Sequence, residues 1–362
     1  MVTTVLSQLI EDKAFDELCG DLSARSSTLR DCQDFPFQQL DLCAKTGVFK
    51  WFSGAEWGGL GWNAADLYRA YIKLANACLT TTFVITQRQG ATRRIEKSEN
   101  TELASKLVPD LIRGKLFATL AVSHLTTSGR HLGKPAMLCQ EVEGGFQLNG
   151  FSPWVTGAVN ADWIVLGAVT ENQSQIMLAL DCKSAGVLCQ AGPELTALSS
   201  SQTGSLKCDN VFVPHEHVLA GPADNVMQSS IGGNTGGLQT SALALGLARG
   251  AIDFIAQESI QRQHLSESCQ ALATQWNDAF DYLIQIAEGD QSADAERLRI
   301  DCNSLVLRAT QASLTAAKGA GFLDSHPVGR WCRQAMFFLV WSCPQPVQNA
   351  NLCEFAGIET NE

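Results

Sequence analysis

The chain has 362 residues, of which 45% are hydrophobic and 17% charged, and its formal net charge is −11. This length predicts about two to three domains, and the apolar content excludes a generally disordered chain. The negative charge argues against a nucleic-acid binder or a polybasic membrane-surface protein.

The chain start and its apolar segments predict a cytoplasmic protein without a membrane span. The first residues are amphipathic and acidic, with no basic region before an apolar run, so we expect no signal peptide. The apolar stretch Met336–Trp341 is far too short to cross a bilayer.

The 13 cysteines show no metal-binding pattern. No Cys-x-x-Cys pair is present, and no pair of histidines separated by three to five residues lies nearby to complete a zinc site. Most of them lie in apolar helical segments, as Cys19, Cys302 and Cys332 do. We therefore interpret them as small buried residues of a reducing compartment, and we predict no metal site.

Residues 1–114 predict an N-terminal helical domain with one glycine-rich loop. The loop is Ser53–Trp62, in which four glycines give the backbone the freedom for a tight turn. A local basic run follows, and we interpret it as an exposed helix face. It consists of Arg88, Arg93, Arg94 and Lys97.

Residues 115–225 predict a β middle domain, because the hydrophobic period changes there. Short β-rich runs are separated by Gly, Asn, Asp and Pro, which is typical of a small antiparallel β-barrel or sandwich. The runs are Phe117–Val122, Gly145–Asn149, Trp163–Val169, Ile176–Leu180 and Val211–Val213.

Residues 226–362 predict a C-terminal four-helix bundle. Apolar stripes at helical spacing begin at Leu245, Leu272 and Leu298, and the polar stretch Glu288–Asp294 predicts a turn between two helices. The predicted fold class is therefore mostly α with a β middle domain.

Four local phrases occur in order along the chain, and they are Ala55–Gly61, Gly144–Gly150, Ser205–Pro214 and Ala248–Asp253. With the order helix, β, helix, they resemble the acyl-CoA dehydrogenase family of flavoproteins over most of the chain. The first phrase is similar to the family loop Pro-Glu-x-Gly-Gly-x-Gly, with Gly54 at the usual proline position.

The resemblance implies a bound flavin adenine dinucleotide (FAD), with its isoalloxazine ring between the β domain and the bundle. By position, Trp154 and Thr156 would contact the ring. An indole offers a flat apolar wall and a hydroxyl can hydrogen-bond to the polar edge of the ring. The alternative for Trp154 is an ordinary strand tryptophan in the domain core.

A second flavin loop of the family corresponds to the segment after Val122. Ser123 keeps a hydroxyl there, and Ser128 and Gly129 keep small size and backbone access. The Glu, Pro and Asp of the family loop are absent. The resemblance therefore implies that Val122, Ser123, Ser128 and Gly129 hold the flavin largely through backbone groups.

Arg262 stands where the family has an arginine that pairs with the pyrophosphate of a neighbouring subunit's cofactor. The resemblance therefore implies a homodimer or homotetramer built through the bundle. The stripe Leu298–Ala316 and the apolar patch Met336–Trp341 also favour an interface. The alternative is that stripe and patch pack on each other within one chain.

The usual catalytic base of the family is missing. Dehydrogenation of an acyl thioester needs a base for the α-proton while a hydride leaves the β-carbon, and a buried carboxylate suits this. The two positions at which the family carries that glutamate correspond to Ser342 and Gly236. An alcohol is a poor base without a partner, so the catalytic residue stays unknown.

Three functions remain open. The first is an acyl-CoA dehydrogenase-like, FAD-dependent oxidoreductase that acts on CH–CH groups of an acyl thioester or related small acid derivative and passes electrons to an acceptor. The second is a monooxygenase of the same fold that uses oxygen and reduced flavin from a flavin reductase. It needs no α-proton base, and Ser123, His124 and Ser342 would lie near the ring. The third is a catalytically inactive structural or binding homologue.

Overall fold

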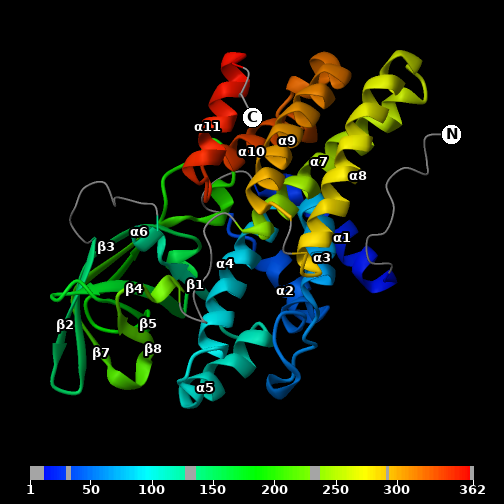
Figure 1. Ribbon diagram of the computed structural model, residues 1–362. Helices are drawn as coiled ribbons and strands as arrows, with labels where there is room; N and C mark the ends of the chain where they lie inside the picture. Colours follow the sequence, from blue (N-terminus) through cyan, green and yellow to red (C-terminus); the bar gives the residue numbers. More distant parts are fainter. Residues whose placement is uncertain (1–11, 30–33, 127–135, 229–236, 291–292, 359–362) are drawn as a thin grey trace. The chain divides into compact units, whose positions relative to one another are not determined.

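The computed structural model describes residues 12–29, 34–126, 136–228, 237–290 and 293–358 (Figure 1). The chain forms two compact units, and each is described by itself. The first contains Met1–Thr28, Asn63–Thr82 and Thr235–Glu362, and the second contains Leu29–Trp62 and Phe83–Asn234. The three-domain division with boundaries at residues 114 and 225 stays a prediction.

The first unit is a helical bundle in which α7 packs mainly against α3, α8 and α9. The shorter helix α1 packs on α3, and α10 and α11 pack on α9. The bounds are α1 (Lys13–Arg25), α3 (Ala64–Ala77), α7 (Leu238–Ser259), α8 (Ser266–Ala287), α9 (Ala295–Ala317), α10 (Pro327–Ala335) and α11 (Gln345–Ala356).

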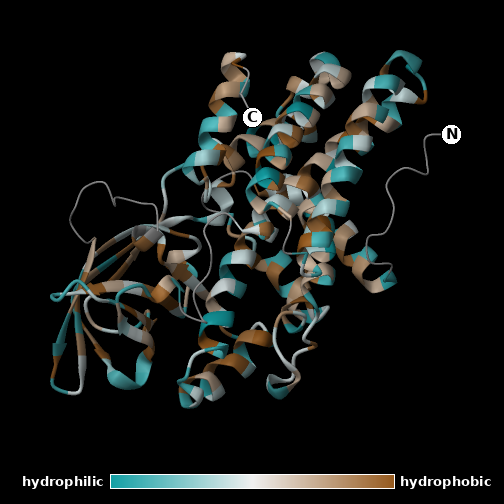
Figure 2. Ribbon diagram, viewed as in Figure 1, coloured by the Kyte–Doolittle hydropathy of each residue, from teal (hydrophilic) through white to brown (hydrophobic). Residues whose placement is uncertain are grey.

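The stripes predicted from the sequence form the core of this bundle, and apolar and polar residues alternate along its helices (Figure 2). Leu245, Trp276 and Leu298 are fully buried, and the Trp276 indole N–H donates to the carbonyl of Leu245 at 2.8 Å. Because the α9 stripe is buried within its own unit, it gives no support to a subunit interface. Of the apolar patch, Phe338 is also buried, whereas Val340 is 76% exposed.

Helices α3 and α7 approach each other closely at Gly246. A Cβ atom there would lie 2.5 Å from the Ile72 carbonyl oxygen and 2.7 Å from the Ala75 methyl carbon. We expect Gly246→Ala to lower the free energy of unfolding by about 1–2 kcal/mol, because overpacking against backbone outweighs the better helix propensity of alanine. Chemical denaturation measures the loss.

Gly250→Ala, one turn later, is the matched control for this substitution. Its Cβ would meet the flexible end of the Asn76 side chain, at 2.7 Å from Oδ1, which can rotate away. Both variants gain the same helix propensity, so equal changes in stability would contradict the close approach at Gly246.

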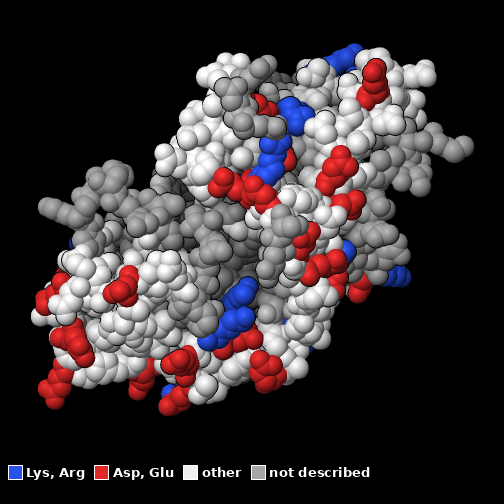
Figure 3. Space-filling model, in the orientation of Figure 1, with Lys and Arg blue, Asp and Glu red and all other residues white. Residues whose placement is uncertain are grey.

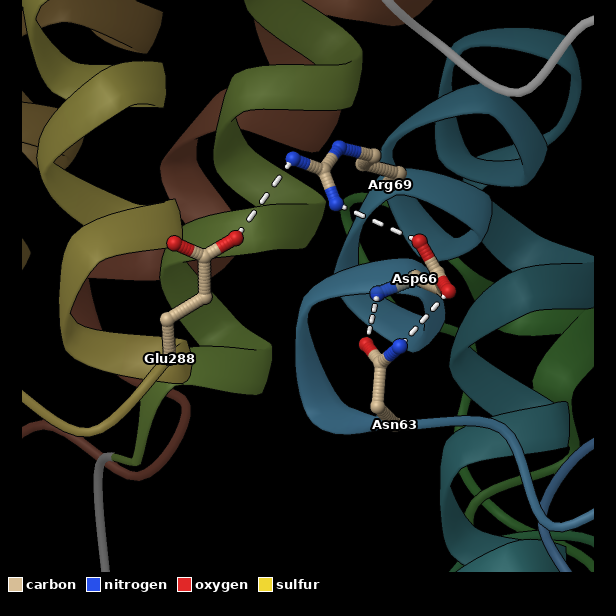
Figure 4. A network of polar contacts seen from close by, with 4 residues as sticks. All are labelled: Asn63, Asp66, Arg69 and Glu288. Atoms are coloured by element: carbon tan, nitrogen blue, oxygen red, sulfur yellow. Dashed lines mark hydrogen bonds and ion pairs between the residues drawn. The ribbon is translucent and has the colours of Figure 1, made fainter.

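A polar network joins the start of α3 to the end of α8 (Figure 4). The Asn63 side chain caps α3 by accepting from the Asp66 N–H at 2.9 Å, and its Nδ2 donates to Asp66 Oδ2 at 2.8 Å. Arg69 forms ion pairs with both acidic residues: its Nη1 lies 3.2 Å from Asp66 Oδ1, and its Nη2 lies 3.9 Å from Glu288 Oε1. These pairs are partly exposed and add little stability, but they fix how the chain enters α3.

The second unit contains one eight-stranded sheet in the order β6-β7-β3-β2-β4-β5-β8, with β1 beside β4. Most neighbours are antiparallel, as predicted, but β4 pairs in parallel with β1 and β2, so the sheet is mixed. The strands are β1 (Ala118–Ala121), β2 (Met137–Val142), β3 (Gly145–Val155), β4 (Trp163–Thr170), β5 (Gln175–Asp181), β6 (Val187–Gln190), β7 (Gly204–Pro214) and β8 (Val218–Ala223).

The part of the sheet around β5 is buried on both faces. Along β5, Leu178 belongs to one hydrophobic cluster, and Met177 and Ala179 belong to another that includes residues of α4 and α5. The helices of this unit are α2 (Phe37–Lys45), α4 (Leu79–Glu96, which begins in the first unit), α5 (Thr101–Ile112) and α6 (Ser123–Thr126). Among the described residues, no helix is long and apolar enough to cross a membrane.

The basic run on α4 is not an exposed face, and this interpretation was wrong for two of its four residues. Arg88 and Arg94 are only 2% and 8% exposed. Arg88 lies over the Phe49 ring, 3.7 Å from its centroid, and donates to the carbonyl of Leu111 at the end of α5 and to that of Leu116 in the segment after it. Burial lowers the pKa of Arg88 to about 9. This arginine therefore caps a helix end and is not available to bind a phosphate.

The surface carries the negative charge expected from the composition. On the face drawn in Figure 3, acidic side chains are spread widely and basic side chains gather in a few groups. Many of the basic groups pair with acidic ones along the same helix, as Arg297 does with Asp301 at 3.1 Å. Such exposed pairs contribute little to stability.

Candidate functional site

Trp154, which is predicted to cover one face of a flavin ring, lies near the end of β3. The register between β3 and β7 shifts between Ser152 and Val155, and both of these residues are fully buried. Trp154 lies between them and is 50% exposed. A bulge of this kind turns a side chain away from the core. Trp154 is therefore not a core tryptophan, and about half of its flat apolar surface is exposed to solvent.

Thr156 follows directly and is held by other hydroxyls. It is 4% exposed, its Oγ1 lies 3.1 Å from Thr203 Oγ1, and Thr203 Oγ1 lies 2.8 Å from Ser201 Oγ. The Gly157 N–H donates to the Ser201 carbonyl at 3.0 Å and anchors the same turn. Since a hydroxyl can donate one hydrogen bond and accept two, Thr156 retains capacity for the polar edge of a ring.

The second predicted flavin segment lies beside β3 in the same unit. Val122 and Ser123 are both half-buried, at the end of β1 and the start of α6. Both β1 and α6 contact β3, so the fold brings this segment next to the strand that carries Trp154. Ser128 and Gly129 lie outside the described residues. The wall and hydroxyls that are described suit a flat aromatic cofactor with a polar edge, which is what a flavin ring offers.

Arg262 is engaged within its own chain. Its guanidinium forms an ion pair with Glu258, one turn earlier, and donates to the carbonyl of Ala316 at 2.6 Å. The side chain is 22% exposed. It thereby ties the end of α7 to the end of α9, and a phosphate group would compete with Glu258 for the same guanidinium.

Ser342 follows the 3₁₀ helix η11 (Met336–Leu339) with a φ of +44°, a left-handed conformation that is unusual outside glycine. The backbone before it is held from α9. Arg299 Nη2 donates to the carbonyls of Phe338 and Trp341 at 3.1 Å each. Asn303 Nδ2 also donates to the Phe338 carbonyl at 3.1 Å. Gly236, the other predicted base position, lies outside the described residues.

Arg299 places a buried positive charge beside Ser342, and the sequence analysis missed it. The residue is 1% exposed, and burial lowers its pKa to about 10. Its Nε and Nη1, together with Asn303 Oδ1, have no hydrogen-bond partner in the described parts of the chain. The available signal was an arginine next to Leu298 within an apolar stripe. A guanidinium at this place favours a negative charge on a bound group.

Glu354 does not substitute for the missing base. Its carboxylate accepts a hydrogen bond from Ser304 Oγ at 2.7 Å and lies 3.9 Å from Arg308 Nε. Both partners are on α9, so this carboxylate serves to attach α11 to the bundle. The segment from Met336 to Pro344 contains no Asp or Glu.

Known proteins share both the sequence pattern and the architecture, although no protein-family model matches the chain. Isovaleryl-CoA dehydrogenase of Oryza sativa subsp. japonica is 25% identical over 254 residues, which are 64% of this chain and 61% of that protein. Acyl-CoA dehydrogenase of Bacillus subtilis is 20% identical over 97% of both chains. The structure of butyryl-CoA dehydrogenase from Megasphaera elsdenii superimposes with a TM-score of 0.80, at 17% identity, over 95% of this chain and 98% of that one.

The chain has an acyl-CoA dehydrogenase-like fold. The predicted fold class, with a β middle part between helical ends, is thereby confirmed. Dibenzothiophene monooxygenase from Paenibacillus also shares this fold, with a TM-score of 0.77 and 17% identity over 94% of this chain and 95% of that one. The chain spans 61–62% of the length of the isovaleryl-CoA dehydrogenases from Oryza sativa subsp. japonica and Solanum tuberosum that it matches.

Proposed function

We propose that this protein is an FAD-dependent oxidoreductase of the acyl-CoA dehydrogenase type, acting on an acyl thioester or a related small acid derivative. The observation that carries the proposal is the half-exposed indole of Trp154 beside the fixed hydroxyl of Thr156. These are the two positions that the resemblance assigns to the flavin ring. The names of the two relatives from Oryza sativa subsp. japonica and Bacillus subtilis, which are acyl-CoA dehydrogenases, support the same substrate class.

The residues of the chain have separate tasks in this proposal. A bound flavin supplies a hydride acceptor. Trp154 covers an apolar face of the ring and excludes water from it, and Thr156 hydrogen-bonds to its polar edge. Ser342 occupies the position of the usual base, and Arg299 favours the anionic form of the group that binds there. Because an alcohol removes a weakly acidic proton poorly, we expect substrates whose α-proton is already activated.

A monooxygenase of the same fold is the second candidate. Two observations favour it, namely the lack of any carboxylate from Met336 to Pro344 and the buried cation Arg299 beside Ser342. Reaction of reduced flavin with oxygen needs no α-proton base, and a cation beside the reacting atoms stabilises developing negative charge. The likeness to dibenzothiophene monooxygenase supports the fold part of this candidate. It would require a separate flavin reductase.

One experiment separates the candidates. The purified protein is loaded with FAD and titrated anaerobically with acyl-CoAs of several chain lengths, and loss of flavin absorbance near its long-wavelength maximum is followed. Bleaching supports the dehydrogenase, which then needs an external electron acceptor. No bleaching, combined with oxygen consumption when a flavin reductase is added, supports the monooxygenase. A protein that stays colourless with excess FAD contradicts both and supports an inactive homologue.

We also propose that the chain assembles into a homodimer or homotetramer. The support comes from the end of the described chain, where Leu352 and Phe355 on α11 and Ile358 just after it are 58%, 56% and 60% exposed. Exposed apolar groups of this kind favour contact with another surface. Light scattering over a wide concentration range tests this, and a mass that stays near 39 kDa contradicts it.

A further inference from the structure

Three hydroxyl groups form a chain that ends at Thr156. Thr156 Oγ1 lies 3.1 Å from Thr203 Oγ1, which lies 2.8 Å from Ser201 Oγ. Ser201 is fully buried, and Thr156 is 4% exposed. Among the described residues, the hydroxyl groups of Ser201 and Thr203 have no partners besides these. The chain therefore begins inside the protein and ends at the residue that the proposed function places beside the flavin ring.

The turn that carries Ser201 has an unusual backbone conformation. Leu198 and Gln202, on either side of the 3₁₀ turn η6 (Ser199–Ser201), have φ angles of +62° and +45°. Such left-handed angles are uncommon outside glycine and persist only where neighbouring contacts determine them. Here the Gly157 N–H donates to the carbonyls of Ser201 and Gln202 at 3.0 and 3.1 Å. The turn is thereby fixed against the end of β3, and with it the place of the Ser201 hydroxyl.

The number of available partners assigns the protons of this chain. A hydroxyl group donates one hydrogen bond and accepts up to two, and an unpaired buried donor is costly. The Ser201 proton has only Thr203 Oγ1 to donate to in the described part of the chain. The Thr203 proton then goes to its other neighbour, Thr156 Oγ1. The reverse order would leave the proton of Ser201 unpaired at a fully buried site. The Thr156 proton is therefore the one that remains for a bound group.

We propose, on the basis of the proposed function, that Ser201 and Thr203 are positioning residues that make Thr156 a hydrogen-bond donor toward the flavin ring. The polar edge of an oxidised flavin ring offers hydrogen-bond acceptors, whereas an added N–H makes part of that edge a donor in the reduced ring. A Thr156 proton that is turned outward fits the first and opposes the second. We therefore expect Thr156 to stabilise the oxidised form of the bound flavin relative to the reduced form.

The two hydroxyl groups behind Thr156 act on it in two ways. A threonine side chain has several staggered rotamers, and the hydrogen bond from Thr203 favours the one in which the two oxygens meet. Hydrogen bonds in a chain also polarise one another, so Thr156 donates more strongly while it accepts from Thr203. Without Thr203 the hydroxyl of Thr156 remains, but its direction is no longer fixed. We therefore expect a variant of Thr203 to lose part of the preference for oxidised flavin.

Two dissociation constants measure this preference. The flavin-free, full-length protein is titrated with oxidised FAD and, under anaerobic conditions, with FAD reduced by dithionite. The ratio of the two constants also sets the reduction potential of the bound flavin, which is measured independently against an indicator dye. We expect Thr156→Val to lower the affinity for oxidised FAD about tenfold and to change that for reduced FAD by less than about twofold. The potential should then rise by about 30 mV for a two-electron couple.

Variants of the two positioning residues carry the test. Thr203→Val should lower the affinity for oxidised FAD about threefold and raise the potential by about 15 mV. Thr203→Ser keeps the hydroxyl and should restore the values of the unaltered protein. Ser201→Ala should shift the potential in the same direction as Thr203→Val but by less. In a double variant, adding Thr203→Val to Thr156→Val should cause no further change, because Thr203 acts only through Thr156.

Ser199→Ala is the matched control in the same buried turn. The Ser199 hydroxyl donates to the Leu195 carbonyl and accepts from the Leu195 N–H, at 2.9 Å each, and takes no part in the hydroxyl chain. Its removal loosens the turn but leaves Ser201, Thr203 and Thr156 in place. We expect this variant to keep the potential of the unaltered protein. Circular dichroism shows whether each variant is folded, and Ser201→Ala decides the question if Thr203→Val does not fold.

Several outcomes overturn the proposal. One is an unchanged ratio of dissociation constants in folded Thr203→Val. Another is a further loss when Thr203→Val is added to Thr156→Val, since Thr203 would then act on its own. A third is an equal shift of the potential in Ser199→Ala, which would point to a loosened turn. A protein that binds flavin in neither form contradicts the proposed function as well, whereas flavin binding with an unchanged ratio overturns the role of Ser201 and Thr203 alone.

Discussion

Trp154→Ala is expected to weaken flavin binding by about 10- to 100-fold. The indole is 50% exposed on β3, so a bound ring would cover it, and losing that contact removes about 1.5–3 kcal/mol of apolar and aromatic interaction. Fluorescence titration of the flavin-free protein with FAD measures the dissociation constant. Trp154→Phe keeps a smaller flat ring, and we expect it to lose less than half of that free energy.

Phe212→Ala is the matched control for this variant. Phe212 is also 50% exposed and also lies in the sheet, but it is on β7 opposite Gln147, near the other end of β3. We expect its flavin affinity to stay within about twofold, as for an ordinary exposed apolar residue. Equal affinities for Trp154→Ala and the unaltered protein, with both folded by circular dichroism, would remove the observation on which the proposed function rests.

The helical core could be predicted from the sequence because its signal is local. Stripes at helical spacing place Leu245, Trp276 and Leu298 on buried faces, and the structure confirms them. The turn predicted at Glu288–Asp294 is confirmed as well, because α8 ends at Ala287 and Asp294 caps α9 by accepting from the Glu296 N–H at 2.8 Å. Helix periodicity and capping chemistry are carried by residues close in the chain.

The sheet could be predicted only in part. Strands β2, β6 and β8 were missed because they are short and contain polar or small residues, so they show no clear β-rich run. Their pairing also depends on distant partners, as in the parallel contact of β2 with β4, where Leu138 is opposite Val169. A single sequence does not report such long-range pairing.

The candidate site, like the sheet, could be predicted only in part. The resemblance pointed to Trp154 and Thr156, but the exposure of the indole comes from a register shift between β3 and β7 that no local pattern indicates. Arg88 was interpreted as part of an exposed helix face, and Arg299 was missed, for another reason. Arginine is usually a surface residue, and here each guanidinium is buried because it donates to backbone carbonyls at the end of a helical segment.

Arg299→Met is expected to destabilise the protein by about 2–3 kcal/mol and to loosen the turn at Ser342. Methionine keeps much of the apolar stem but leaves the Trp341 carbonyl without the donor it has at 3.1 Å, whereas the Phe338 carbonyl keeps Asn303. Hydrogen bonds from a charged donor contribute about 1.5–3 kcal/mol, and the vacated volume adds to the loss. Hydrogen exchange should quicken at least tenfold for the amides of residues 336–344, which report on the turn itself.

The dependence of this loss of stability on pH follows from the burial of Arg299. Burial lowers the pKa of Arg299 from 12.5 to about 10 in the folded protein. Because the pKa of Arg299 is lower in the folded than in the unfolded protein, its titration adds to the free energy of unfolding fully above the unfolded-state pKa. That contribution is lost as the pH falls through the folded-state pKa. Both pKa values lie above pH 9, so the difference in the free energy of unfolding between Arg299→Met and the unaltered protein should stay constant from pH 6 to pH 9.

Arg297→Met is the control on the same helix, because Arg297 is 60% exposed and paired with Asp301. We expect it to change the free energy of unfolding by no more than about 0.5 kcal/mol. Equal losses in the two variants, or unchanged exchange of residues 336–344 in Arg299→Met, would show that Arg299 does not hold the turn.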